Sequence, residues 1–345
     1  MDINKAKDIV INAGKELVAR GLIARTWGNV SQRVDEKTMV ITPSGKDYLS
    51  LSREDIVAVN IGNLEYTGDV KPSSEKGIHA SCYKEKDVNF VIHTHQEYAS
   101  VVSACNVDYI DVDERYPLLD KRVICAPYGL PSTKKLCKGI TSVLPKTNGS
   151  CIIMKNHGAL CFGKDFEETF DAANQLEAAC TRYLENKYLE IAEAEEYSDK
   201  SLTQLIMSKY GVHIESFKPK VLNSELTDNM IINTSLEAVA LSYLKKPLQP
   251  MVDDFAQIVS LKMDSVDNNQ KSIHKALKTA DAVFVKGCGA VCVGADAEAV
   301  SMIVEKNSKV FLGASLHGKV KPINSFESRL MRTVFKMKYS KQKAK

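Results

Sequence analysis

Asn89-Phe90-Val91-Ile92-His93-Thr94-His95 is an apolar segment that ends in two histidines. Residues 90–93 are typical of a buried strand. Because alternate residues of a strand point to the same face, about 7 Å apart, His93 and His95 can reach one metal ion. The pair alone is weak evidence, since zinc sites use three or four ligands and buried histidines are often only hydrogen-bonded.

Two further segments strengthen the prediction of a metal site. Pro72-Ser73-Ser74-Glu75 lies upstream and supplies a carboxylate. Residues 151–158 lie downstream and are typical of a second apolar strand, one that ends at His157. We therefore expect a site made of three histidines, with Glu75 nearby.

Length and composition limit the classes of protein to consider. The 345 residues are enough for two domains, and 44% hydrophobic and 26% charged residues are ordinary for a globular protein. A formal net charge of +3 gives no support to nucleic-acid binding. Nine cysteines without a Cys-x-x-Cys pair indicate reduced thiols of a cytosolic protein. The N-terminal segment has no signal-peptide pattern and no apolar run reaches membrane-spanning length, so we expect a cytoplasmic protein with no membrane partner.

The hydrophobic pattern predicts helices and strands in mixed order. Residues 3–20 follow helical spacing, and a second helix is expected from Ser73 to about residue 86. Strands are expected at residues 26–33, 38–41, 55–60, 90–93 and 151–157. Asp165 is expected to cap a long helix. Strands with flanking helices predict an α/β sandwich.

The segment from residue 216 to 345 differs in composition from the part before it, and residues 216–220 are typical of a linker. Residues 155–165 and 286–296 share Lys, Gly, Ala, Cys, Gly and Asp at one offset. We expect a domain at residues 1–215, followed at 216–345 by a degenerate partial repeat with a basic tail. A chance similarity between two strand–glycine–helix units is the alternative. The lysine-rich residues 336–345 are interpreted as a solvated terminus rather than a nucleic-acid arm.

Six motifs occur along residues 1 to about 215 in the order found in one known family. They are Gly28-Asn29-Val30-Ser31, Thr42-Pro43-Ser44-Gly45, Pro72-Ser73-Ser74-Glu75, His93-Thr94-His95, Cys125-Ala126-Pro127-Tyr128 and Asn156-His157-Gly158. This part of the chain therefore resembles the class II aldolase/adducin family, and most closely its L-fuculose-phosphate aldolase branch. The resemblance implies a mixed, mainly antiparallel sheet with helices on both faces. It also implies a cyclic homotetramer with active sites between subunits.

The resemblance assigns catalytic roles to matching residues. It implies that His93, His95 and His157 bind Zn²⁺, or another divalent metal, with positions left open for a substrate. It implies that Glu75 is the acid/base that moves the proton of the enediolate carbon. The structural alternative for Glu75 is a carboxylate at a helix N-terminus that only favours the helix dipole.

A phosphate site is also implied, with donors from turns and a helix start, where anions bind readily. Its residues are Asn29, Ser44, Gly45, Ser73 and Ser74. Each has a plain alternative as a turn residue or a helix cap. Tyr210 resembles the family's tyrosine that reaches a neighbouring subunit's site and protonates the aldehyde oxygen, but this chain continues well beyond it. The remaining histidines are interpreted as core or surface residues: His79, His213, His274 and His317.

The function that the resemblance implies is a zinc-dependent aldolase. It would cleave a phosphorylated ketose, a small phosphorylated sugar like L-fuculose 1-phosphate, to dihydroxyacetone phosphate and an aldehyde. A pentulose 5-phosphate 4-epimerase is one alternative, although that branch carries Asp where this chain has Glu75. A methylthioribulose-phosphate dehydratase is another. A non-catalytic adducin-like interaction module is the alternative from a different class, and adducin heads have lost the histidines that this chain keeps.

Overall fold

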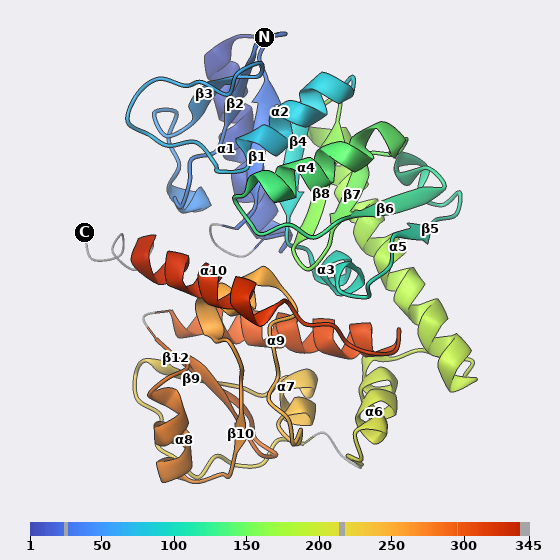
Figure 1. Ribbon diagram of the computed structural model, residues 1–345, viewed down its shortest axis with the longest axis vertical. Coiled ribbons are helices and arrows are strands. Elements are labelled where there is room, and N and C mark those ends of the chain that lie inside the picture. Colours follow the sequence, from blue (N-terminus) through green and yellow to red (C-terminus); the bar gives the residue numbers. More distant parts are fainter. Residues whose placement is uncertain (24–26, 214–217, 295, 339–345) are drawn as a thin grey trace. The chain divides into compact units, whose positions relative to one another are not determined.

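The computed structural model describes residues 1–23, 27–213, 218–294 and 296–338. It divides into two compact units (Figure 1). Unit 1 comprises Met1–Ser103 and Val107–Tyr183, and unit 2 comprises Ala104–Asn106 and Leu184–Lys345. The expected domain boundary at residues 215 and 216, the first residues of the expected linker, and residues 339–345 of the tail lie outside the described residues. Among the helices of the described ranges, none has the length and apolar character needed to cross a membrane.

Unit 1 is built on an eight-stranded sheet, in which every pairing is antiparallel except that of β6 with β7. This confirms the expected mixed, mainly antiparallel sheet. The strands, in their order across the sheet, are β3 (Val57–Asn60), β2 (Thr38–Ile41), β1 (Asn29–Arg33), β4 (Phe90–Thr94), β8 (Gly158–Gly163), β7 (Cys151–Met154), β6 (Arg122–Ala126) and β5 (Tyr109–Asp111).

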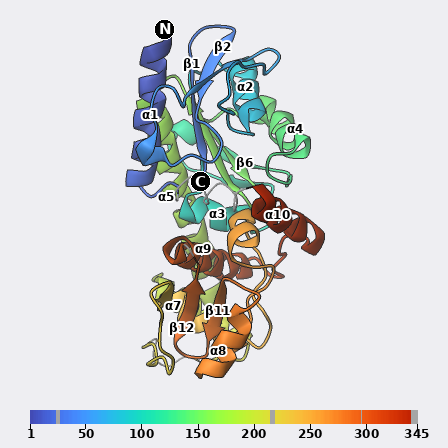
Figure 2. The ribbon, with the colours of Figure 1, turned by 90° about the vertical axis from the view of Figure 1, so that its left-hand side faces the viewer.

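Helices cover both faces of this sheet (Figure 2). α1 (Ile3–Ala19) packs on β1 and β2, while α2 (Lys76–Glu85) and α4 (Lys134–Val143) lie on the opposite face. α2 and α4 bury apolar side chains such as Ile78 and Ile140 against the sheet residues Met39 and Leu160. The remaining helical segments are α3 (Glu97–Ser103), the long α5 (Phe166–Ala192), and the short turns η1 (Tyr48–Ser50), η2 (Pro117–Leu119) and η3 (Leu144–Lys146).

The structure differs from the sequence-based expectations at two places that shape the site. The apolar segment expected to be one strand through residue 157 ends at Met154, and the chain turns back through His157 into β8. The helix expected from Ser73 begins at Lys76, so Glu75 is its N-cap residue. β8 was not predicted, because its short buried run between two glycines has no period that separates a strand from a turn.

Unit 2 holds a smaller, four-stranded sheet in the order β10 (Ser265–Val266), β11 (Ala282–Val285), β12 (Gly289–Val293) and β9 (Met230–Asn233). β10 and β11 are parallel and the other pairs are antiparallel. The helical segments of unit 2 are α6 (Asp199–Lys209), α7 (Leu236–Leu241), η4 (Phe255–Val259), α8 (Gln270–Leu277), α9 (Ala297–Ser315) and α10 (Ser325–Lys338).

The four strands of unit 2 have the same order and directions as β6, β7, β8 and β4 of unit 1. A close backbone approach recurs as well. A Cβ added to Gly158 would lie 2.2 Å from the carbonyl oxygen of Thr94, and one added to Gly289 would lie 2.1 Å from that of Asn233. Both hairpins therefore use a glycine to bring the neighbouring strand close.

Candidate active site

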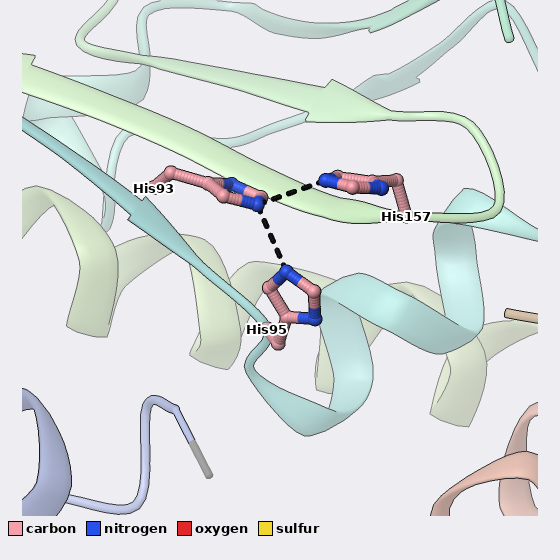
Figure 3. Close-up of side chains that lie close together, drawn as sticks. All are labelled: His93, His95 and His157. Carbon is pink, nitrogen blue, oxygen red and sulfur yellow. Dashed lines mark hydrogen bonds between the residues drawn. The ribbon is translucent and has the colours of Figure 1, made fainter. Parts of the chain in front are cut away.

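Three histidine side chains converge at the end of β4 (Figure 3). His93 lies on β4, His95 directly follows it, and His157 lies in the turn between β7 and β8. The Nε2 atoms of His95 and His157 each lie 2.9 Å from Nε2 of His93. All three side chains are buried. β4 pairs with β8 immediately beyond this turn, so the sheet register carries His157 to the other two.

The protonation of His93 suits a metal ligand. Its Nδ1–H donates to the carbonyl oxygen of Ala159 at 2.8 Å, which leaves the Nε2 lone pair directed at the cluster. Burial lowers the pKa of His93 well below its ordinary value, and the adjacent imidazoles add to this, although the charge of Glu75 opposes it. The lowered pKa favours the neutral ring that metal binding requires.

The donor set and its spacing fit a divalent transition metal. The three ligand nitrogens lie within 4.8 Å of one another, and no other such cluster occurs in the described part of the chain. Zn–N bonds of about 2.0–2.1 Å in a tetrahedral site separate ligand nitrogens by roughly 3.3 Å. Small side-chain rotations would bring the observed spacing to this value. The sequence-based prediction that His93, His95 and His157 come together is thus confirmed in geometry.

Glu75 lies beside this cluster. Its Oε2 is 3.7 Å from Nε2 of His93, and its Oε1 is 3.5 Å from Nε2 of His157. The carboxylate is buried, and the side-chain amide of Asn29 donates to Oε2 at 2.9 Å. Burial by itself raises the pKa of Glu75, but the neighbouring imidazoles and the Asn29 hydrogen bond outweigh it and hold the pKa below its ordinary value. The side chain is at the N-cap position of α2 but makes no capping hydrogen bond to its own helix.

The turns that carry the expected phosphate-binding residues lie side by side. Pro43 and Pro72 form an antiparallel bridge, flanked by hydrogen bonds from Ser44 N to the Lys71 carbonyl and from Ser73 N to the Thr42 carbonyl. This pairing brings the turn that contains Gly45 next to the one that contains Ser74. The hydrogen-bond donors of the two turns, and Gly45 with its positive φ, thus lie together at the edge that these paired turns form.

The polar groups at this edge already have some protein partners. The Ser73 hydroxyl accepts from the backbone N–H of Glu75 at 3.2 Å, and the Ser74 hydroxyl lies 2.7 Å from that of Ser132. Asn29 directs one amide hydrogen to Glu75, which leaves its second amide hydrogen for another acceptor.

Tyr210 belongs to unit 2, whereas the histidine cluster belongs to unit 1. It is the C-cap residue of α6, is 44% exposed, and packs its ring against Phe311 with centroids 5.7 Å apart.

Sequence reasoning missed a group of buried polar residues that is linked to Glu75 through Asn29. His79, interpreted only as a core or surface histidine, is fully buried and hydrogen-bonded to Asn29 and Ser31. Tyr83 hydrogen-bonds to Ser31 in turn. The signal was present in the spacing, because Glu75, His79 and Tyr83 recur every four residues on one helix face.

Comparisons with known proteins match the part of the chain that carries this site. Residues 8–184 match the family model described as the Class II Aldolase and Adducin N-terminal domain. A 5-deoxy-D-ribulose 1-phosphate aldolase of Bacillus thuringiensis is 29% identical over 189 residues, which cover 54% of this chain and 88% of that protein. An L-fuculose phosphate aldolase of Methanococcus maripaludis is 30% identical over 162 residues, covering 47% of this chain and 86% of that protein.

A solved structure is similar as well. The structure of an L-fuculose 1-phosphate aldolase superposes with a TM-score of 0.50 and 26% sequence identity. It covers 57% of this chain and 92% of that one. The matched part of the chain contains all three histidines and Glu75.

Proposed function

Because this chain belongs to the class II aldolase and adducin family and is a lyase of the aldolase type, we propose that it cleaves a phosphorylated ketose by a retro-aldol reaction. The products are dihydroxyacetone phosphate and an aldehyde. The observation that carries this proposal is the buried Glu75 carboxylate, which lies 3.5 Å and 3.7 Å from two of the three converging imidazoles.

His93, His95 and His157 hold the divalent ion, which we propose to be Zn²⁺. Bound there, the ion would act as a Lewis acid and would stabilise the negative charge left on the ketone fragment when the carbon–carbon bond breaks. The bond from Nδ1 of His93 to the Ala159 carbonyl fixes that ring and keeps its Nε2 basic. Three neutral ligands leave the positive charge of the ion undiminished, in support of this role.

In the synthetic direction the Glu75 carboxylate removes a proton from the carbon of the ketone fragment and becomes the carboxylic acid; in the cleavage direction the same transfer runs in reverse, and the acid returns that proton to the carbon. Its burial excludes competing water, and Asn29 holds one carboxylate oxygen at 2.9 Å. Proton transfer to carbon is slow without a positioned acid, so the fixed geometry is what makes the carboxylate effective.

The substrate phosphate binds at the edge formed by the two paired turns, through Asn29, Ser44, Gly45, Ser73 and Ser74. Backbone and hydroxyl donors at a helix start favour an anion. The pairing of the Pro43 and Pro72 turns supports this proposal, because it gathers these donors beside Glu75.

The chain assembles as a homotetramer in this proposal, and Tyr210 serves a neighbouring subunit's site. In the synthetic direction its phenol protonates the aldehyde oxygen and becomes the phenolate; in the cleavage direction the same transfer runs in reverse, and the phenolate oxygen takes the proton of the substrate hydroxyl. Its 44% exposure supports a role outside its own packing environment.

Residues 216–345 form a degenerate partial repeat of the aldolase core in this proposal, without a metal site of its own. The matching order and directions of the four strands support it, and so does the shared turn. Asn156 (φ 55°) precedes His157, and Gly287 (φ 81°) precedes Cys288 at the corresponding place. Cys288 lies in an apolar cluster with Val283. The second copy would therefore keep the hairpin but have Cys288 in place of the metal ligand His157.

The test of the proposed function is a substrate screen with zinc-loaded protein. We expect release of dihydroxyacetone phosphate from ketose 1-phosphates, with 5-deoxyribulose 1-phosphate and L-fuculose 1-phosphate as first substrates. Pentulose 5-phosphates and methylthioribulose 1-phosphate test the epimerase and dehydratase alternatives. Epimerisation or water loss without any release of dihydroxyacetone phosphate would refute the proposal.

A further inference from the structure

A row of buried polar side chains runs between β1 and α2, away from the histidine cluster. Asn29 and Ser31 alternate on β1 and therefore point to one face of the sheet. Glu75, at the start of α2, is followed on the same helix face by His79 and Tyr83. The strand and helix residues interleave, and all five are at most 8% exposed. Buried polar groups are costly unless each finds a partner, and these five side chains are linked to one another by hydrogen bonds.

The direction of each hydrogen bond follows from chemistry. The Glu75 carboxylate accepts, so the Asn29 amide nitrogen faces it and the Asn29 carbonyl oxygen faces His79. A carbonyl oxygen only accepts, so Nε2 of His79 carries the hydrogen. In a neutral ring Nδ1 then accepts, and the Ser31 hydroxyl, 2.6 Å away, donates to it.

The chain of bonds ends at Tyr83. Because the Ser31 hydroxyl uses its hydrogen on His79, its oxygen accepts from the Tyr83 hydroxyl at 2.6 Å. The bonds therefore run in one direction, from Tyr83 through Ser31, His79 and Asn29 to Glu75. The other neutral tautomer would set two acceptors, Nε2 of His79 and the Asn29 carbonyl oxygen, against each other.

We propose that His79 is a positioning residue whose neutral, Nε2-protonated imidazole fixes the Asn29 amide and thereby holds the Glu75 carboxylate against the histidine cluster. Asn29 is well placed to transmit this constraint, because it pairs with His93 across β1 and β4. The sheet thus fixes the backbone of Asn29, and His79 fixes the carbonyl end of its side-chain amide. The role of Glu75 in proton transfer rests on the proposed function, whereas the direction of the hydrogen bonds does not.

The surroundings of His79 favour the neutral ring. Burial lowers the pKa of His79 to about 4, although the charge of Glu75 raises it in part. Burial also raises the pKa of Tyr83, which keeps the phenol protonated as the donor that starts the chain.

Replacement of His79 by two different side chains tests the proposal through kinetics. His79→Leu removes both hydrogen bonds, and we expect kcat for dihydroxyacetone phosphate release to fall about tenfold or more, with KM changed less than about threefold. His79→Gln keeps an N–H donor for Asn29 and should restore kcat to within about threefold of wild type. Metal content should be unchanged in both variants.

Cys82→Ala is the matched control, because Cys82 is buried on the same helix but takes no part in the row. The two variants are compared at an equal loss of stability, and a fall in kcat for His79→Leu no larger than that for Cys82→Ala would contradict the proposal. A kcat of His79→Gln as low as that of His79→Leu would contradict it as well. Should His79→Leu fail to fold, Ser31→Ala replaces it, with an expected fall in kcat of about threefold or more. An unchanged kcat in that variant would equally contradict the proposal.

A second measurement does not depend on activity. Nitrogen-15 chemical shifts of the histidine rings in the purified wild-type protein distinguish the two neutral tautomers from the imidazolium. We expect His79 as the Nε2–H tautomer at neutral pH, and an Nδ1–H tautomer or an imidazolium would overturn the assignment. If the wild-type enzyme released no dihydroxyacetone phosphate from any ketose phosphate, the proposed function would fail. The nitrogen-15 measurement would still decide the direction of the hydrogen bonds in the row.

Discussion

Individual residues define the candidate site, and the sequence was most informative about those that share a motif. The spacing of His93 and His95 predicted one face of a strand, and the structure brings both to His157. The hydrogen bonds that hold Glu75 could not be predicted. They depend on how α2 lies across β1, and local periodicity does not determine the packing of a helix on a particular strand.

Glu75→Gln should lower turnover by roughly a hundredfold or more while metal binding persists, because the amide cannot deliver or accept the proton. The change is nearly isosteric, and the Asn29 amide can still donate to the remaining carbonyl oxygen. Steady-state release of dihydroxyacetone phosphate and metal content measure the two effects. Near-normal turnover would show that Glu75 is only structural.

His79 should make stability depend on pH in a defined window. Its pKa is about 4 in the folded protein against 6.5 ordinarily, so the unfolded chain binds the proton first as the pH falls. The free energy of unfolding should therefore decrease by roughly 3 kcal/mol between about pH 6.5 and pH 4 on account of this residue. His79→Gln should remove that part of the decrease. Urea unfolding at several pH values checks this, and equal pH dependence in both proteins would contradict it.

At the level of elements, the β7–β8 hairpin is what completes the site. The expectation of one strand through residue 157 was wrong, because the chain reverses after Met154 and pairs with itself. That reversal places His157 in a turn beside β4 instead of at a strand end. Sequence periodicity predicted β2 with its bounds and α1 nearly so, since both have a clear pattern and clear end signals. The hairpin lacked such signals.

Gly158→Ala should destabilise the protein, because its new Cβ would lie 2.2 Å from the Thr94 carbonyl oxygen on the strand that carries His93. We expect a loss of about 1–3 kcal/mol in the free energy of unfolding, together with weaker metal retention. Gly77→Ala is the control, since its Cβ would meet no atom closer than 3.4 Å. Urea unfolding measures the free energy of unfolding of both variants. An equal, small loss in the two variants would contradict the close approach of Gly158 to the Thr94 carbonyl oxygen.

For the whole molecule, the sequence was informative about unit 1 and much less so about unit 2. Six ordered motifs indicated the family, and the family match at residues 8–184 confirmed it. The short repeat at residues 286–296 pointed to a glycine turn followed by a helix, but not to the strands β9, β10 and β12. The strands β9 and β10 carry few residues that resemble their counterparts, and strand order is a property of the sheet that no single segment encodes.

Cys288→Ser should leave metal content and turnover unchanged, because a lone thiolate does not make a zinc site. Cys288 corresponds in position to His157, so the variant tests whether the proposed second copy is inactive. Metal analysis of both proteins at equal concentration measures this. A second metal ion per chain that disappears in the variant would refute the proposal for residues 216–345.

The central claim is that the three histidines hold the metal on which aldol cleavage depends. The most direct measurement compares metal content and dihydroxyacetone phosphate release in the wild-type protein and in His93→Ala. We predict that the wild-type protein holds about one zinc ion per chain. We predict that His93→Ala folds but has lost both the ion and the activity. A folded His93→Ala protein that retained the full metal content, or that cleaved the ketose phosphate at the wild-type rate, would contradict the claim.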